Sequence, residues 1–351
     1  MQAEEVPTLR ERARIVAALA RNRAAETERL GRLHAEVLTA LQRAGLPQML
    51  KDGSPCTIRE FVDVCGILAE GCMSTGWCNF VWGMHNYLVG RYPRAVQEAV
   101  WRDPGTLVSA SLGPVGHAPA ITGEGAVVSG RWAFNSGCDH ADWLLLGISQ
   151  PEGEPHLGVL HKSECQIDDG SWNVIGLRGT GSKDAVCEHV PVPAERLMPF
   201  SRIMVPYMAL LILVIVGPVI GGAQAAVREF ARKIGGSAGE GALLRLGEAS
   251  AEVDAARTVV LAAADELDAD PTPDASVTTR IVRDTAFAAR LCNRATQRLF
   301  EAAGGAELQE SRELQRIFRD VTAGCAHARL QWEAQALPYA RMLAGDQSVP
   351  A

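Results

Sequence analysis

The first third of the chain carries its apolar residues at helical spacing. In ARIVAALARNRAAETERLGRLHAEVLTALQRAGL, starting at Ala13, apolar side chains recur every three or four positions, with Arg and Glu between them. The pattern stops at Gly45–Leu46–Pro47, a sequence typical of a helix end, and resumes after Thr57, a residue type favoured at helix N-caps. We therefore predict that residues 1–102 are helical.

The spacing changes at Asp103–Pro104–Gly105. Up to about Pro199, apolar residues alternate with polar or small ones in short runs such as TLVSASLG, DWLLLGIS and HLGVLHK, separated by Gly, Pro, Asp and Asn. This pattern predicts a β-barrel domain of about seven strands. Helical spacing then returns and persists, so the order is helices (1–102), strands (103–199) and a helical bundle (200–351), which is an α+β fold class.

One segment is apolar enough to resemble a membrane span. Residues 203–227 contain no charged residue, and a span needs roughly 20 apolar residues. Pro206 and Pro218 divide the segment, however, so we interpret it as a buried core helix and expect no membrane association.

Composition limits the kinds of partner. The 351 residues are 47% hydrophobic and carry a formal net charge of −7, so the clustered basic residues of a nucleic-acid surface are not expected. Nine cysteines without a CxxC pair indicate reduced thiols, no metal site and a cytoplasmic protein. The charged start of the chain, MQAEEVPTLRERAR, has no apolar signal-peptide core.

The stretch GRWAFNSGCDHADW, Gly130 to Trp143, concentrates aromatic and small residues ahead of an apolar run. One interpretation is a strand and a turn that bring backbone amides close to a flat ring, since glycine permits such close approach. The alternative is a hairpin in which SGCDH only makes the turn and the aromatic residues fill the barrel core. The stretch alone leaves both open.

Four segments together resemble the acyl-CoA dehydrogenase fold, and more closely the flavin-dependent monooxygenases built on it. They are STGW with HNYL at 74–88, GxWxFxSG at 130–137, GLRGTGSKD at 176–184, and AAGGAEL with RIFRDVTAGCAH at 302–327. In the dehydrogenases, a Glu in a Tyr-Glu-Gly-Thr stretch after the Arg-Asp pair removes the substrate α-proton. Here Arg319–Asp320 is followed by VTAGCAHARL, with His327 and Ala328 at the corresponding place. The resemblance therefore favours the monooxygenase branch, the oxygenase components of two-component hydroxylases.

The resemblance implies a cofactor and a chemistry. A separate reductase would supply reduced FMN or FAD, whose C4a-hydroperoxide transfers one oxygen atom of O2 to an aromatic or polyketide-like molecule. No GxGxxG fingerprint follows a strand, so NAD(P)H is not expected to bind. The substrate itself, and hydroxylation at carbon or nitrogen, stay open. The alternatives are an acyl-CoA dehydrogenase-like oxidoreductase, disfavoured by the missing Glu, and a non-catalytic relative that kept the fold.

The same resemblance implies cofactor-binding residues. Ser136 and Gly137 would face the flavin edge, with Trp132 and Phe134 around the ring and Thr180 and Ser182 beside the ring or substrate. Gly304 and Gly305 would approach the phosphate or nucleotide tail from a neighbouring subunit of a homotetramer. Because the Arg and Gln that many relatives place on the pyrophosphate are not evident, FMN is favoured over FAD.

Ser136 and two histidines are the candidate catalytic residues. By resemblance, His85 lies in the substrate pocket, where it could hydrogen-bond a hydroxyl or carbonyl; otherwise it is a core histidine with its hydrogen bonds satisfied. His327 is expected to deprotonate a phenol as general base or to hold the distal oxygen of the hydroperoxide, and its alternative is a helix-surface histidine.

Overall fold

The computed structural model describes residues 7–236 and 238–345. The first helices begin at the caps that the sequence supplies: Thr8 forms a capping box with Glu11, and the Thr57 hydroxyl accepts the Glu60 N–H at 3.0 Å. The N-terminal helices are α1 (Leu9–Asn22), α2 (Ala24–Leu30), α3 (Ala35–Arg43), α4 (Ile58–Gly71), α5 (Met73–Val89) and α6 (Arg94–Val100).

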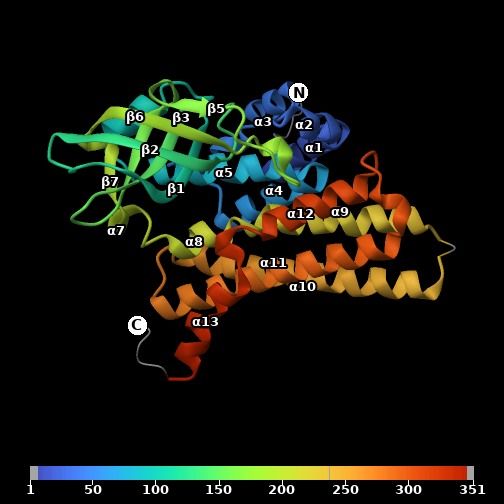
Figure 1. Ribbon diagram of the computed structural model, residues 1–351. Coiled ribbons are helices and arrows are strands. Elements are labelled where there is room, and N and C mark those ends of the chain that lie inside the picture. The colour runs from blue at the N-terminus through green and yellow to red at the C-terminus, as the bar shows by residue number, and fades with distance from the viewer. Residues whose placement is uncertain (1–6, 237, 346–351) are drawn as a thin grey trace, which may run out of the picture.

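Helix α5 occupies the centre of the molecule. Its sequence from Met73 to Val89 has no charged residue, and nearly every position is buried. It packs against α4, against the bundle and against the first strand, and therefore lies between the β region and the helical bundle (Figure 1). A helix without a charged face to turn to solvent is stable in such an enclosed position.

Seven strands follow, in the number that the period-two pattern predicts. They are β1 (Val108–His117), β2 (Gly125–Asn135), β3 (Trp143–Ser149), β4 (His156–His161), β5 (Gln166–Asp168), β6 (Lys183–Pro193) and β7 (Leu197–Pro199). The sheet order is β5-β6-β2-β1-β3-β4-β7, with β1 and β3 parallel and the other pairs antiparallel.

The strands of the predicted β-barrel domain form one sheet that is open between its first and last strands. Strands β5 and β7 are its two edges, and β1 pairs with β2 only at His117 and Ser129, so the sheet bends there into two halves. Side chains from both halves meet in a second hydrophobic core that includes Trp132, Leu144 and Leu160. This core closes the β region without a complete ring of hydrogen bonds.

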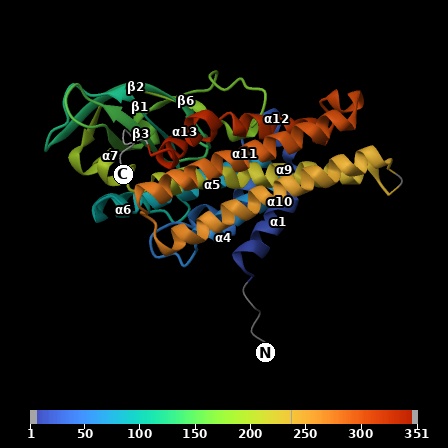
Figure 2. The same ribbon diagram turned by 90° about the horizontal axis from the view of Figure 1, so that it is seen from below.

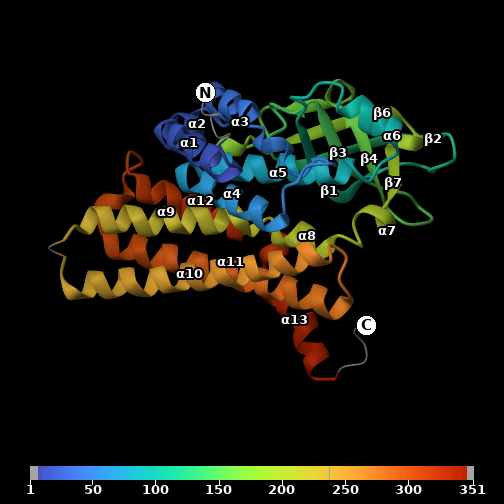
Figure 3. The same cartoon turned by 180° about the vertical axis from the view of Figure 1, so that it is seen from behind.

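The remaining chain is helical: α7 (Phe200–Ile203), α8 (Met208–Leu213), α9 (Val216–Ile234), α10 (Glu240–Ala269), α11 (Ala275–Ala303), α12 (Glu313–Cys325) and α13 (Trp332–Leu343). Helices α9, α10 and α11 run side by side (Figure 2), and α13 projects from the bundle (Figure 3). Among the described residues, the segment Met208–Ile234 has the length and hydropathy of a membrane span, but 89% of its apolar window is buried inside the protein. The burial agrees with the predicted core helix.

Candidate functional site

The expected turn after β2 is present and is built around Ser136. Phe134 adopts a positive φ of 65° one residue before β2 ends, and the Ser136 N–H bonds back to the Phe134 carbonyl at 2.9 Å. The Ser109 hydroxyl of β1 donates to the Ser136 carbonyl at 2.8 Å. Ser136 is thereby held between two strands with 8% of its surface exposed.

Three of the predicted hydroxyl groups lie in one row. The Ser136 and Ser182 oxygens are 2.7 Å apart, and the Ser182 and Thr180 oxygens are 2.6 Å apart. The Gly137 N–H donates to the Thr180 carbonyl at 2.8 Å, so the two turns are also joined through their backbones. The structure therefore brings together Ser136, Gly137, Thr180 and Ser182, which are 43 or more positions apart between the two turns.

This hydroxyl row, Ser136–Ser182–Thr180, has a direction. The Thr180 hydroxyl donates its single proton to the Leu177 carbonyl at 2.8 Å, so towards Ser182 it can only accept. Ser182 must then donate to Thr180, and Ser136 must donate to Ser182. The Trp77 indole N–H donates to the Ser136 oxygen at 3.3 Å. A hydroxyl oxygen accepts two hydrogen bonds, so Ser136 keeps one free acceptor position.

The two candidate histidines have their Nδ1 atoms bound in opposite ways. His85 on α5 has Nδ1 3.0 Å from the Val108 carbonyl, which can only accept, so Nδ1 carries the proton and Nε2 is an acceptor. His327, at the N-cap of the 3₁₀ turn Ala328–Leu330, accepts the Arg329 N–H through Nδ1 at 3.2 Å, so its Nε2 carries the proton. Burial lowers both pKa values to about 4, and Arg329 adds to the effect at His327.

These tautomers favour one of the two roles expected of His327. A neutral imidazole whose Nε2 already carries a proton donates a hydrogen bond from that nitrogen and cannot remove a proton with it. His327 therefore fits the second expected role, holding an oxygen atom, better than that of general base. Its ring lies 6.2 Å from the ring of Trp77, which joins it to the hydroxyl row.

The two aromatic residues of the opening stretch lie elsewhere than expected. Trp132 has no exposed surface, and its indole donates to the Gly147 carbonyl at 2.7 Å inside the β core. Phe134 is 69% exposed and meets the edge of Trp172. The barrel-core alternative therefore describes Trp132, because a side chain without accessible surface cannot contact a ring.

Glycines 137, 304 and 305 have different surroundings. Gly137 adopts a φ of 72°, and a Cβ there would lie 2.7 Å from the Trp82 indole nitrogen, so the protein itself requires glycine at this position. Gly304 and Gly305 are exposed at the junction after α11, with no neighbour near an added Cβ. This junction is away from the hydroxyl row within one chain, and its contact with a cofactor through a partner subunit stays a prediction.

Sequence reasoning missed the residues that fix the 175–182 segment. Asp320 on α12 accepts the Leu177 N–H at 2.6 Å, and Arg319 bonds the Ile175 carbonyl and pairs with Glu28 at 2.6 Å. Lys183, at the end of this segment, pairs with Asp139 at 2.6 Å and Asp169 at 2.7 Å. The proximity of Arg319–Asp320 to this segment depends on tertiary packing, and no sequence spacing reports it.

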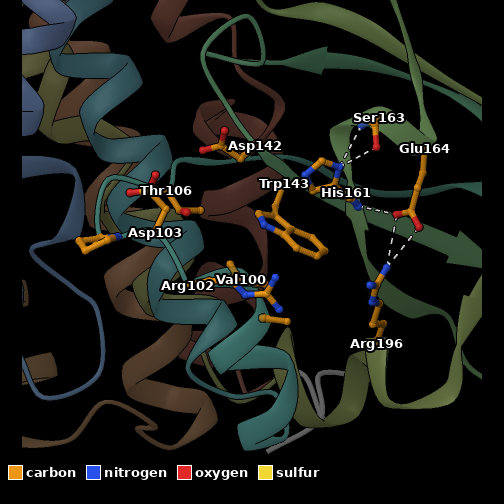
Figure 4. A pocket seen from close by; sticks show the side chains of 12 residues that line it. Val100, Arg102, Asp103, Thr106, Asp142, Trp143, His161, Ser163, Glu164 and Arg196 are labelled. Atoms are coloured by element: carbon orange, nitrogen blue, oxygen red, sulfur yellow. Dashed lines mark hydrogen bonds and ion pairs between the residues drawn. The ribbon is translucent and has the colours of Figure 1, made fainter.

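An open cavity of about 810 Å³ lies apart from the hydroxyl row, between α6 and the edge of the sheet (Figure 4). The Arg196 guanidinium lies over the Trp143 ring and pairs with Glu164, and His161 meets the same ring edge-on. The cavity shares no residue with the hydroxyl row, and its Arg196 and Glu164 form an ion pair with each other. We therefore do not assign the catalytic site to this cavity. Across the described residues, no three His, Cys, Asp or Glu side chains gather as a metal site would require.

The order of a helical domain, a β domain and a helical bundle is that of the acyl-CoA dehydrogenase fold, and His327 and Ala328 stand where the dehydrogenases carry their carboxylate base. Residues 213–332 match the family model of the acyl-CoA dehydrogenase C-terminal domain. The chain is 32% identical to the flavin-dependent monooxygenase oxygenase subunit HsaA of Rhodococcus jostii, over 92% of each chain, and 29% identical to the FADH(2)-dependent resorcinol hydroxylase oxygenase component of Rhizobium, over 91% and 90%.

The crystal structure of a 3-HSA hydroxylase from Rhodococcus superposes with a TM-score of 0.90 at 29% identity, covering 98% of this chain and 97% of the other. The chain belongs to the flavin-dependent monooxygenase family, as an oxygenase component that uses reduced flavin. The predictions of fold class, enzyme class and flavin cofactor are confirmed. A two-component system also implies a partner flavin reductase.

Proposed function

We propose that this oxygenase component hydroxylates a phenolic or related aromatic small molecule, with reduced flavin delivered by a separate reductase. The relatives named above include a resorcinol hydroxylase, and p-hydroxyphenylacetate 3-hydroxylase of Acinetobacter baumannii is 25% identical over 96% of this chain. The side chains of Trp77 and Ser109, which bond directly to Ser136, are uncharged, which suits a neutral ring better than an anionic thioester.

The observation that carries the proposal is the free acceptor of Ser136. In a reduced flavin, N5 bears a hydrogen and donates; in an oxidised flavin, N5 has no hydrogen and accepts. A serine oxygen that already receives the Trp77 N–H and gives its own proton to Ser182 offers that N5–H its remaining acceptor position. The residues present therefore fit a reduced flavin, and Ser136, Gly137, Thr180 and Ser182 would hold its ring edge.

The roles of the side chains follow from their tautomers. The bound reduced flavin supplies the activation of O2 and the transferred oxygen atom. His85, with Nε2 as acceptor, is suited to take the proton of a substrate hydroxyl, and His327, with Nε2–H, is suited to hold an oxygen atom by donation. The buried surroundings of Trp77 and Ser136 keep water from the site.

We also propose a homotetramer in a reducing, cytoplasmic environment. Exposed apolar side chains on α11, on α13 and after Gly304 support assembly: Phe287, Leu337, Leu343 and Leu308. All nine cysteines are free thiols, which supports the reducing compartment. Light scattering at micromolar concentration tests the assembly, and a monomer would overturn it.

The structure and the relatives leave FMN and FAD as equal candidates, which anaerobic titration with each reduced flavin distinguishes.

The decisive experiment pairs the purified protein with a generic flavin reductase, NADH and a panel of phenols and aromatic amines. We expect a product heavier by one oxygen atom from at least one phenol. Ser136→Ala should still bind flavin, yet should convert more of the consumed NADH into hydrogen peroxide. Ser163→Ala, a serine in the separate cavity, is the control. Absence of any oxygenated product, with reduced flavin bound, would contradict the proposed substrate class.

A further inference from the structure

The segment Gly176–Ser182 carries two members of the hydroxyl row and is held by a different domain. Leu177 takes a positive φ of 55°, which is costly for a branched side chain and persists only when neighbours fix it. Asp320 accepts the Leu177 N–H at 2.6 Å from helix α12. A Cβ on Gly176 would lie 2.1 Å from the Arg319 carbonyl, so this segment and α12 are in backbone contact.

The carbonyl of Leu177 is the end point of the row. It accepts both the Thr180 N–H at 3.0 Å and the Thr180 hydroxyl at 2.8 Å. If Leu177 turned away, the Thr180 proton would be free to point at Ser182, and each hydroxyl along the row could reverse. Ser136 would then accept from Ser182 as well as from Trp77, and no acceptor would remain for a ligand.

We propose that Asp320 is a positioning residue: by fixing Leu177 it sets the direction of the Thr180–Ser182–Ser136 row, so that Ser136 presents an acceptor that selects reduced over oxidised flavin. The proposal deepens the proposed function by assigning the redox preference of its flavin site to a carboxylate that bonds the Leu177 backbone and none of the three hydroxyls. Asp320 acts only through Leu177 and Thr180.

At neutral pH, an ionised Asp320 destabilises the folded protein more than a neutral side chain at this position would. The pKa of Asp320 is raised to about 6, chiefly by burial and also by Glu28 on α2. The Leu177 N–H opposes this rise, as do Arg316 and Arg319 on the same helix. Cys72, between α4 and α5, is the other titratable group that faces it. Because the folded pKa lies above 3.8, the ionised form destabilises the folded state above pH 6 relative to the protonated form. Asp320→Asn should therefore melt at a higher temperature than wild type at pH 7.5, and the difference should shrink towards pH 4.5.

The test measures flavin affinity and does not require a substrate. For each variant, the dissociation constant for oxidised flavin is divided by that for reduced flavin, the latter measured under anaerobic conditions. This ratio expresses the preference for reduced flavin. We expect Thr180→Val, which removes the hydroxyl but keeps the shape, to lower the preference for reduced flavin by about 5–10-fold, equal to one hydrogen bond of about 1 kcal/mol. Thr180→Ser keeps the hydroxyl and should keep the ratio.

Asp320→Ala should lower the ratio as Thr180→Val does, and the double variant should add nothing, because both act through the same proton. Hydrogen exchange of residues 176–182 in the flavin-free protein should accelerate at least tenfold in Asp320→Ala. Asp63→Asn, a half-buried carboxylate that pairs with Arg10 and Arg257, is the control for loss of a buried charge.

An unchanged ratio in Thr180→Val overturns the proposal, even if Asp320→Ala fails to fold. Faster exchange in Asp320→Ala with an unchanged ratio also overturns it, since Asp320 would then be structural only. These results are independent of the phenol screen. A wild-type protein that prefers reduced flavin but oxygenates no phenol leaves this proposal supported and the proposed substrate class refuted.

Discussion

Two regions of the molecule, the C-terminal half of α5 and the turn after α12, each carry a candidate histidine, but their backbones bind it differently. On α5, His85 lies on a helix that is buried all round and gives its Nδ1 proton to a strand carbonyl, that of Val108. After α12, His327 caps a 3₁₀ turn and receives a backbone N–H from Arg329. Burial lowers the pKa of both histidines.

The difference between them lies in the second nitrogen. Where Nδ1 bonds a carbonyl, Nδ1 carries the proton and Nε2 accepts; where Nδ1 bonds an N–H, Nε2 carries the proton and donates. A strand end supplies a carbonyl and a helix start supplies an N–H, so the backbone next to each histidine selects its chemistry. The same residue type is thereby suited to take a proton at one position and to hold an oxygen at the other.

The largest effect is expected from His85→Asn. The Asn amide can still donate to the Val108 carbonyl, but it has no group at the position of Nε2. Loss of a general base lowers the rate by about 10²–10⁴-fold, so formation of hydroxylated phenol should fall by that order. Product formation per NADH consumed is measured by chromatography, with the exposed His161→Asn as control. If His85→Asn forms as much product per NADH consumed as the wild type, His85 is a core histidine without a role in catalysis.

His327→Asn should have the next largest effect. The Asn oxygen can accept the Arg329 N–H in place of Nδ1, and the distal donor is lost. Removal of a donor that is aimed at developing charge costs about 10²–10³-fold, so consumed NADH should appear mainly as hydrogen peroxide. His327→Gln, which places an amide N–H farther out, should recover part of the yield. If the yield matches wild type and the protein only melts earlier, His327 has no part in the chemistry.

The dependence of stability on pH tests the lowered pKa values of the two histidines. A histidine whose pKa falls from 6.5 to about 4 on folding stabilises the folded protein above pH 6.5 and loses that contribution as the pH falls towards 4. For the buried His85 the difference is about 3 kcal/mol, and His85→Asn should remove it from urea unfolding curves compared at pH 4.5 and 7.5. Turnover should show no step from either histidine between pH 6 and 8, and a step near pH 6.5 that His85→Asn or His327→Asn abolishes would contradict the lowered pKa values.

The smallest expected effect concerns Trp77, whose ring lies near His327 and whose N–H reaches Ser136. Trp77→Phe keeps an aromatic ring and removes the donor, at a cost of about 0.5–1.5 kcal/mol in the free energy of unfolding. The peroxide fraction should rise only slightly, because Ser136 keeps its bond to Ser182. Trp101→Phe, which loses its indole bond to Asn86, is the matched control. A larger effect on coupling than that of His327→Asn would reverse the order proposed here.

The sequence by itself determined the order of elements. The 3.6-residue and two-residue periods are local properties, so helices, seven strands and a bundle could be predicted, and Thr57 caps its helix as expected. Ser136, Gly137, Thr180 and Ser182 could be selected as candidates only through the resemblance of their motifs to the family, as could the flavin cofactor.

Only the tertiary structure decided how these residues work. Trp132 and Phe134 are two positions apart in one strand, yet a positive φ at Phe134 sends one side chain to the core and exposes the other. The tautomers of His85 and His327, the direction of the hydroxyl row and the bond from Asp320 to Leu177 each depend on a partner from another part of the fold. A hydrogen bond is defined by the position of both atoms, and the sequence specifies which groups exist without specifying which of them meet.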